Sequence, residues 1–191
     1  MKNDWGDNLD VRYYLAKKLK SINNRSVLDV GCGNGYLATL INDTNNYLGI
    51  DNDSDSILKA IKLNPTKTFK TETIEDVYQK FDVIVLANII ECIKDKKRFI
   101  EKAYSLLNDN GVIFITTPNG DNKYFNKKGK VKEKEMIDLL NGYSAKICKW
   151  NPLPIQTHHI LKYIRPLILP IYEFLMDKIN HSVWFYVEIY K

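Results

Sequence analysis

Short runs of apolar, often β-branched residues recur along the chain and alternate with longer stretches in which the apolar positions follow a helical spacing. The runs predict strands near residues 26–30, 47–51, 66–71, 81–87, 112–117, 145–150 and 182–190. A helix is predicted from Asp10 to Ser21, and helices are expected in most gaps between the strands. This alternation is typical of an α/β protein with a doubly wound, mostly parallel sheet covered on both faces. We find no internal repeat and no second domain.

The segment from Val27 to Tyr36 carries the strongest chemical signal. A buried strand ends at Val30, and Gly31, Gly33 and Gly35 follow at alternate positions before an apolar-periodic helix that is expected to start between Gly35 and Ile41. Glycines in a strand-to-helix turn permit positive φ and let a ligand approach the main chain. The dinucleotide fingerprint needs its third glycine where this chain has Tyr36, so the turn favours a ligand without a pyrophosphate at this point.

Two carboxylates lie near the ends of the first two predicted strands. Asp29 precedes the glycines, and Asp51 ends the apolar run that begins at Tyr47, 22 residues after Asp29. The carboxyl ends of parallel strands border the crevice in which open α/β sheets bind ligands. A carboxylate at the end of the second strand can accept hydrogen bonds from both hydroxyls of a ribose. The pattern therefore indicates a nucleoside-containing ligand.

These segments resemble the class I S-adenosylmethionine-dependent methyltransferases, in particular the branch that acts on small molecules such as quinones. The resemblance covers roughly residues 25–120 and depends on four segments in the family's order, namely Leu28 to Gly35, Gly49 to Asp51, Phe81 to Glu91 and Asn110 to Asn119. It implies a Rossmann-like sheet of seven strands whose last strand is antiparallel and inserts between the fifth and sixth. It also implies a single methyltransferase domain over residues 1–191, with an insertion at about residues 151–181.

The resemblance also assigns a cofactor, S-adenosyl-L-methionine, and the residues that would bind it. Asp29 and the turn from Gly31 to Gly35, which includes Cys32, Gly33 and Asn34, would hold its amino-acid end, with Cys32 as a small packing residue. The remaining positions would bind the ribose (Asp51, Asn52), border the adenine (Ile74, Glu75) and lie beside the methyl group (Ala87, Asn88).

No catalytic residue is assigned from the sequence. Many small-molecule members read Glu-His after the fourth strand, whereas this chain reads Glu91 and Cys92, which weakens the case for a histidine base. A base is needed only when the acceptor loses a proton as it attacks. Candidates near the site are Glu91, Tyr124, His158 and His159. Glu91 has the alternative role of capping the following helix, and adjacent histidines on a surface segment are more often solvated.

Composition narrows the remaining alternatives. The three cysteines form no close pair, so neither a disulfide framework nor a metal site is predicted, and the first 25 residues lack the apolar core of a secretory signal. A cytoplasmic location is expected. The fourth strand ends in Leu86, Ala87 and Asn88 without the Asn/Asp-Pro-Pro-aromatic motif, which argues against amino methylation of a DNA base.

Two segments suggest different acceptors. Residues 160–179 are apolar and aromatic but interrupted by Pro166 and Pro170, so they cannot span a bilayer. We interpret this segment as a helix that packs on the sheet or caps the active site, with peripheral membrane contact as the alternative. The basic loop at residues 122–134 and the net charge of +5 make RNA a possible partner. We therefore expect a small-molecule or lipid-like acceptor, with an RNA-modifying enzyme or a non-catalytic cofactor-binding or partner-binding protein as alternatives. The oligomeric state is left open.

Overall fold

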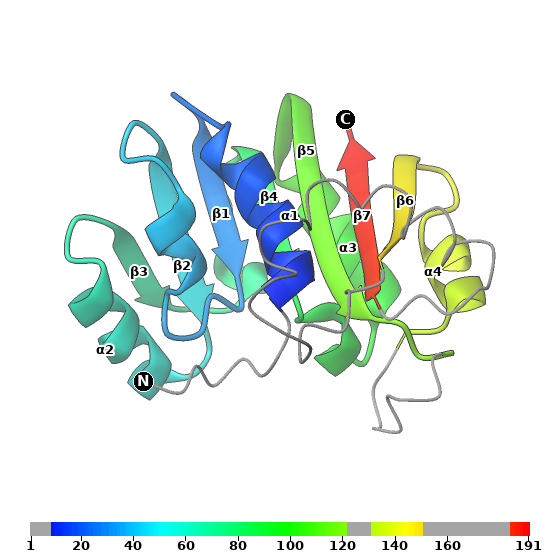
Figure 1. Cartoon of the computed structure of the whole chain (residues 1–191), viewed down its shortest axis with the longest axis horizontal. Coiled ribbons are helices and arrows are strands. Elements are labelled where there is room, and N and C mark those ends of the chain that lie inside the picture. Colours follow the sequence, from blue (N-terminus) through cyan, green and yellow to red (C-terminus); the bar gives the residue numbers. More distant parts are fainter. Residues whose placement is uncertain (1–8, 122–130, 151–183) are drawn as a thin grey trace, which may run out of the picture.

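The computed structural model describes residues 9–121, 131–150 and 184–191. Its strands alternate with helices along the chain, as Figure 1 shows. The strands are β1 (Ser26–Val30), β2 (Asn46–Asp51), β3 (Thr68–Thr71), β4 (Phe81–Ala87), β5 (Leu107–Pro118), β6 (Ser144–Trp150) and β7 (Trp184–Tyr190). The α-helices are α1 (Leu9–Lys20), α2 (Ser54–Leu63), α3 (Lys96–Ser105) and α4 (Glu133–Leu139), and short 3-10 helices are η1 (Leu37–Leu40), η2 (Ile74–Asp76) and η3 (Ile90–Cys92).

The strands form one sheet in the order β3-β2-β1-β4-β5-β7-β6. The strands from β3 across to β5 pair in parallel, whereas β7 is antiparallel to both β5 and β6. The predicted seven-stranded, Rossmann-like sheet with its last strand inserted between the fifth and sixth is therefore confirmed. Because the order reverses between β1 and β4, the carboxyl ends of these two strands flank the crevice expected for a ligand.

The sheet separates two hydrophobic clusters. One contains Leu15 of α1, Leu37 of η1 and Ile57 of α2, and the other contains Phe99 of α3 and Met136 of α4. The alternation of side chains along each strand explains the division, since successive residues project to opposite faces. Val27 of β1 thus belongs to the first cluster and its neighbour Leu28 to the second.

The segment after the glycine turn differs from the prediction. In place of the apolar-periodic helix expected to start between Gly35 and Ile41, the chain forms only the 3-10 helix η1, and Ile41 is already extended. The polar run that follows folds back on itself, because the Asn45 N–H donates to the Asn42 carbonyl and the Thr44 N–H to the Asn42 side chain. A local turn of this kind competes with helix continuation.

Several predicted features lie outside the described residues. They are the insertion at 151–181, most of the basic loop at 122–134, and the candidates Tyr124, His158 and His159. The extent of the domain, the RNA partner and the membrane contact therefore stay predictions. Of the helices that the structure describes, none combines the length and the apolar character that a membrane crossing requires.

Candidate cofactor site at the carboxyl edge of the sheet

The glycine turn, residues 31–35, packs tightly against the elements around it. Gly31 and Gly35 have φ values of +70° and +74°. A Cβ on Gly31 would lie 2.9 Å from Cδ1 of Ile89, and one on Gly35 would lie 2.9 Å from Cβ of Ala60 in α2. The backbone N–H groups of Gly31 and Cys32 both donate to the carbonyl of Ile50, at 2.8 and 3.0 Å. The turn is therefore fixed to the end of β2 on one side and to the segment after β4 on the other.

Asp51 connects the end of β2 to this turn. Its Oδ2 accepts a hydrogen bond from the N–H of Gly33 at 2.8 Å, and its Oδ1 accepts one from the N–H of Asp53 at 3.0 Å. A carboxylate oxygen has two lone pairs, so each still has capacity for a ligand hydroxyl. Asp51 thus has a structural role that the sequence analysis missed, in addition to the predicted ribose contact.

Asp29 is a buried carboxylic acid, and one of its two carboxyl oxygens lacks a hydrogen-bond partner among the described residues. Its side chain is only 1% exposed. Oδ2 accepts a hydrogen bond from the Tyr47 hydroxyl at 2.9 Å, whereas Oδ1 has no hydrogen-bond partner among the described residues. Burial raises the pKa of Asp29 to about 7; the Tyr47 hydrogen bond acts in the opposite direction, and the charge of Asp51 adds to the increase. Buried polar atoms are nearly always paired, so Oδ1 is suited to a hydrogen-bond donor supplied by a ligand.

Two further residues of the glycine turn support this interpretation. Oδ1 of Asn34 is also buried and has no partner in the described part of the chain. The Cys32 side chain is 3% exposed, and burial, followed by the charges of Asp29 and Asp51, raises the pKa of its thiol far above the ordinary value. A thiol held protonated is a poor nucleophile, which agrees with Cys32 as a packing residue. Together, the two unpartnered oxygens fit the ammonium-bearing end of the predicted cofactor.

The residues predicted to border the adenine follow β3 and lie at the same edge of the sheet. The N–H of Glu72 donates to the carbonyl of Asp51 at 3.1 Å, which places this loop beside the end of β2. Ile74 is 4% exposed and packs in the hydrophobic cluster of the α3 face, whereas Glu75 forms an ion pair with Arg98 at 3.6 Å. Asn52 is exposed. Ile74 and Glu75 thus follow a loop that starts beside Asp51, and their contacts with an adenine stay predictions.

The end of β4 is held to the end of β5 by polar contacts. Asn88 has φ +56°, its N–H donates to the Thr116 carbonyl at 2.8 Å, and its Oδ1 accepts from the Thr116 hydroxyl at 3.2 Å. Ala87, immediately before it, is 6% exposed. Ala87 is therefore the last residue of β4, the strand next to β1, and Asn88 follows directly at the same carboxyl edge.

Glu91 lies just beyond this point, in η3. Its Oε2 accepts a hydrogen bond from the hydroxyl of the buried Thr117 at 3.0 Å, and burial raises the pKa of Glu91 above its ordinary value. The alternative in which Glu91 caps the following helix is wrong, since Asp95 is the N-cap of α3 and accepts from the Arg98 N–H at 3.1 Å. Glu91 is thus left without a helix-capping role.

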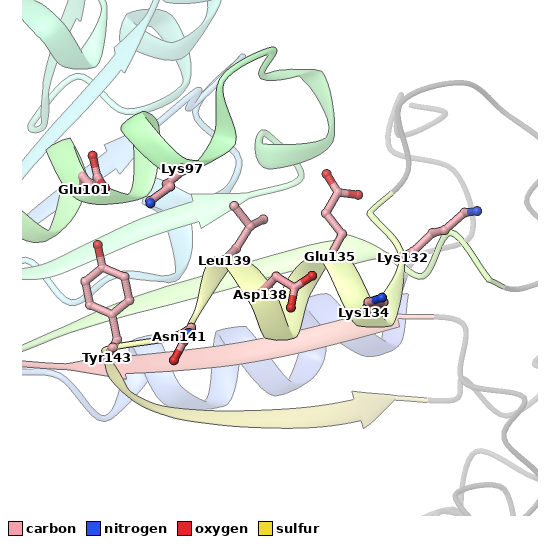
Figure 2. Close-up of a pocket in the computed structure, with 10 residues that line it drawn as sticks. Lys97, Glu101, Lys132, Lys134, Glu135, Asp138, Leu139, Asn141 and Tyr143 are labelled. Atoms are coloured by element: carbon pink, nitrogen blue, oxygen red, sulfur yellow. The ribbon is translucent and has the colours of Figure 1, made fainter.

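A separate hollow of about 800 Å³ lies between α3 and α4, on the other face of the sheet from α1. Figure 2 shows Lys97 and Glu101 of α3 and Asp138 of α4 along it, together with Tyr143, which precedes β6. None of the predicted cofactor residues lines it. In the described residues, no group of three His, Cys, Asp or Glu side chains is placed to hold a metal ion.

Comparison with known proteins agrees with this geometry. A family model for the methyltransferase domain matches residues 22–166. The chain belongs to the methyltransferase domain family. This confirms the resemblance to class I S-adenosylmethionine-dependent methyltransferases inferred from the glycine turn, Asp51 and the segments after them.

Relatives within the methyltransferase family include a ubiquinone biosynthesis O-methyltransferase of Actinobacillus pleuropneumoniae serotype 7 (strain AP76). It is 29% identical over 167 residues, which cover 80% of this chain and 65% of the relative. The chain therefore spans slightly less than two thirds of the length of that enzyme.

Two solved structures share the methyltransferase fold at low sequence identity. The plantazolicin methyltransferase BpumL in complex with SAH has a TM-score of 0.65 at 18% identity, with 93% of this chain and 79% of BpumL covered. The [4+2]-cyclase SpnF has a TM-score of 0.65 at 16% identity, with 95% of this chain and 80% of SpnF covered. Since a methyltransferase and a cyclase match equally well, the fold alone does not determine the reaction.

Proposed function

We propose that this protein binds S-adenosyl-L-methionine at the glycine turn and transfers its methyl group to a small-molecule or lipid-like acceptor. The observation that carries the proposal is the buried Oδ1 of Asp29, which has no partner among the described residues and adjoins a turn of positive-φ glycines. The family membership supports the reaction type, and the name of the ubiquinone biosynthesis relative supports a small acceptor.

Each part of the cofactor has a counterpart at this edge of the sheet. Asp29 and Asn34 present acceptor atoms for the ammonium group, and the positive-φ glycines of residues 31–35 adjoin them. Asp51 keeps acceptor capacity for the ribose hydroxyls while it holds the N–H of Gly33. The bound cofactor would supply a methyl group on a sulfonium that already activates it for displacement.

On the acceptor side, the protein's contribution is alignment and, for a hydroxyl acceptor, removal of a proton. In-line transfer depends mainly on holding the acceptor atom opposite the sulfur. Glu91 is partly buried and lies beyond the end of β4, and burial raises its pKa above the ordinary value, which makes its carboxylate a stronger proton acceptor. We propose Glu91 as the proton acceptor.

The first test is a calorimetric titration with S-adenosylhomocysteine, with NADH as the comparison ligand. We expect binding of S-adenosylhomocysteine alone. Asp51→Ala should weaken this binding by roughly one to two decades, since a charge-assisted contact contributes about 1.5–3 kcal/mol. Asp109→Ala, an exposed residue near the amino end of β5, is the matched control and should bind as the parent does. A folded protein that binds neither ligand would contradict the proposal.

The acceptor class is tested separately with methyl-labelled S-adenosylmethionine. We expect label in small phenolic or quinol acceptors and none in RNA. Label recovered only in RNA would overturn the proposed acceptor while leaving the cofactor site intact.

A further inference from the structure

A hydrogen bond between two neighbouring strands reaches into the candidate site. In the parallel register of β1 and β2, Val27 lies opposite Tyr47 and Asp29 lies opposite Gly49. The Tyr47 hydroxyl therefore passes diagonally over Gly49 to donate to Oδ2 of Asp29 at 2.9 Å. A Cβ on Gly49 would lie 2.9 Å from that hydroxyl and 2.7 Å from Cδ1 of Phe69. The absence of a side chain at residue 49 is thus what lets Tyr47 reach Asp29.

Apolar packing holds the Tyr47 ring in place in addition to the hydrogen bond. Its side chain is 3% exposed, and its ring packs edge-on against Phe69 with the centroids 5.5 Å apart. Its hydroxyl has one proton, which it donates to Asp29. Donation to a carboxylate favours the charged form, and it leaves Oδ1 as the oxygen available to a ligand.

We propose that Tyr47 is a positioning residue for the cofactor. It orients Asp29 so that Oδ1 receives the ammonium group of the ligand, and its hydrogen bond to Oδ2 favours the ionised carboxylate, so that the bond extends the pH range in which the ligand binds toward acid. This inference rests on the proposed function, because it assumes a ligand that carries a free α-amino group.

Few other charges face this pair in the described part of the chain. The charge of Asp51 raises the pKa of Asp29 and so opposes its ionisation. The charge of Asp29 in turn raises the pKa of the Cys32 thiol. Lys67 lies over the Tyr47 ring, with Nζ 5.8 Å from the centroid, and is itself bound to Asp43. The neighbouring elements on this face contribute apolar side chains, namely Leu15 and Leu19 of α1, Leu37 and Ala38 of η1, and Val83 and Val85 of β4. Tyr47 is therefore the hydrogen-bond donor that partly offsets the effect of burial on the pKa of Asp29.

The test is Tyr47→Phe, which keeps the ring against Phe69 and removes only the hydroxyl. Binding of S-adenosylhomocysteine is measured from pH 5.5 to 9 alongside binding of 5′-methylthioadenosine, which has the adenine and ribose but no amino-acid end. We expect the acid limb of the S-adenosylhomocysteine profile to move up by about one pH unit, a roughly tenfold loss of affinity at the acid side of neutral. The affinity for 5′-methylthioadenosine should stay within about twofold at every pH. The alkaline limb should not move, because it reports the ligand's own amino group.

Two variants serve as controls. Tyr104→Phe removes the hydroxyl of a tyrosine that packs against Tyr143 on the other face of the sheet, and its profile should match the parent. Asp29→Asn should bind S-adenosylhomocysteine weakly with no acid limb. If Tyr47→Phe weakens both ligands equally, or leaves the acid limb in place, the inference is overturned.

A ligand-free measurement separates this inference from the proposed function. The carboxyl carbon of Asp29 is followed by NMR as a function of pH in the unliganded protein. Its midpoint should be higher in Tyr47→Phe than in the parent. This shift together with no binding of S-adenosylhomocysteine by the parent would overturn the proposed function and the cofactor role of Tyr47, but not the coupling of the two side chains. An unchanged midpoint would overturn the coupling itself.

Discussion

At the scale of single residues, the candidate site buries a titratable group whose charged form lowers the free energy of unfolding of the unliganded protein. Asp29 is the main case, because burial raises its pKa to about 7 from an ordinary value of 3.8. A group whose proton is bound more tightly in the folded state stabilises the fold fully at low pH, and that contribution is lost as the pH rises from the unfolded pKa through the folded one. The relevant window is therefore about pH 4 to 7.

We predict that Asp29→Asn removes a pH dependence of stability in this window. The free energy of unfolding of the parent, relative to that of the variant, should fall by up to about 4 kcal/mol between pH 4 and pH 7. Urea denaturation at several pH values measures this difference. A constant difference across the window would show that Asp29 is not the buried acid described above.

Asp82 provides a control of opposite sign. Burial acts to raise its pKa, but hydrogen bonds from the Ser26 N–H and the side chains of Asn108 and Ser26 outweigh it, so that the pKa is lowered. Its stabilising contribution is present above the unfolded pKa and is lost as the pH falls toward the folded one. Asp82→Asn should therefore destabilise the protein at pH 7, by about 1 kcal/mol, and have less effect in acid.

Gly35 is a residue at which both the backbone conformation and the packing require glycine. It has φ +74°, and an added Cβ would lie 2.9 Å from Cβ and 3.1 Å from Cα of Ala60, neither of which is the end of a flexible side chain. We predict that Gly35→Ala destabilises the protein by about 2–4 kcal/mol, the sum of a left-handed backbone and an overpacked contact. Thermal unfolding measures the loss.

Gly142→Ala separates the two contributions. Gly142 has φ +92°, and nothing lies within 4 Å of an added Cβ. Its replacement should therefore show only the backbone cost, about 1–2 kcal/mol. Equal losses in the two variants would mean that the contact with Ala60 relaxes freely.

At the scale of elements, the start of α3 distinguishes a structural carboxylate from a functional one. Asp95 accepts the N–H of Arg98 as the N-cap, whereas Glu91 accepts the hydroxyl of Thr117 and its own backbone N–H and makes no contact with the start of α3 in the described hydrogen bonds. We predict that Asp95→Ala lowers the free energy of unfolding by about 1 kcal/mol and leaves methyl transfer unchanged. Glu91→Gln, which can keep the Thr117 contact, should leave stability nearly unchanged and lower turnover of a hydroxyl acceptor. A normal rate in Glu91→Gln would remove Glu91 as the proton acceptor.

The same elements show which parts of the fold can be predicted from sequence. The strand at residues 26–30, the glycine turn and Asp51 could be predicted because their signals are local, and the structure places them at one edge of the sheet. The helix expected after Gly35 was wrong because the turn at Asn42 is a side-chain contact that helical periodicity does not include. Tyr47 was missed because its contact with Asp29 depends on the register of β1 with β2, which no local pattern specifies. A tyrosine two residues before a glycine, on the strand next to a buried acid, is the signal that could have found it.

At the scale of the whole molecule, the sheet binds together regions that are far apart in the chain. Figure 1 shows β7, the last strand, between β5 and β6. Its residues Phe185, Val187 and Ile189 lie in the cluster of the α3 face, and Tyr186 lies in the cluster of the α1 face, which also contains Tyr47 and Cys32. β7 therefore completes the core on both faces, including the face that supports the candidate site.

We predict that deleting residues 184–191 abolishes cooperative unfolding, because β6 pairs only with β7 in the described sheet and β5 loses a partner along its carboxyl half. The deleted protein should expose apolar surface and bind a hydrophobic dye, and it should lose affinity for S-adenosylhomocysteine even though no predicted cofactor residue is removed. Val187→Ala is the matched control. It removes two methyl groups from a fully buried side chain and should lower the midpoint of urea denaturation while leaving the slope unchanged, since the same surface is still exposed on unfolding. If the deleted protein kept the parent's denaturation slope and its cofactor affinity, then β1 to β5 with their helices would form a stable unit by themselves, and the coupling of the site to β7 would be wrong.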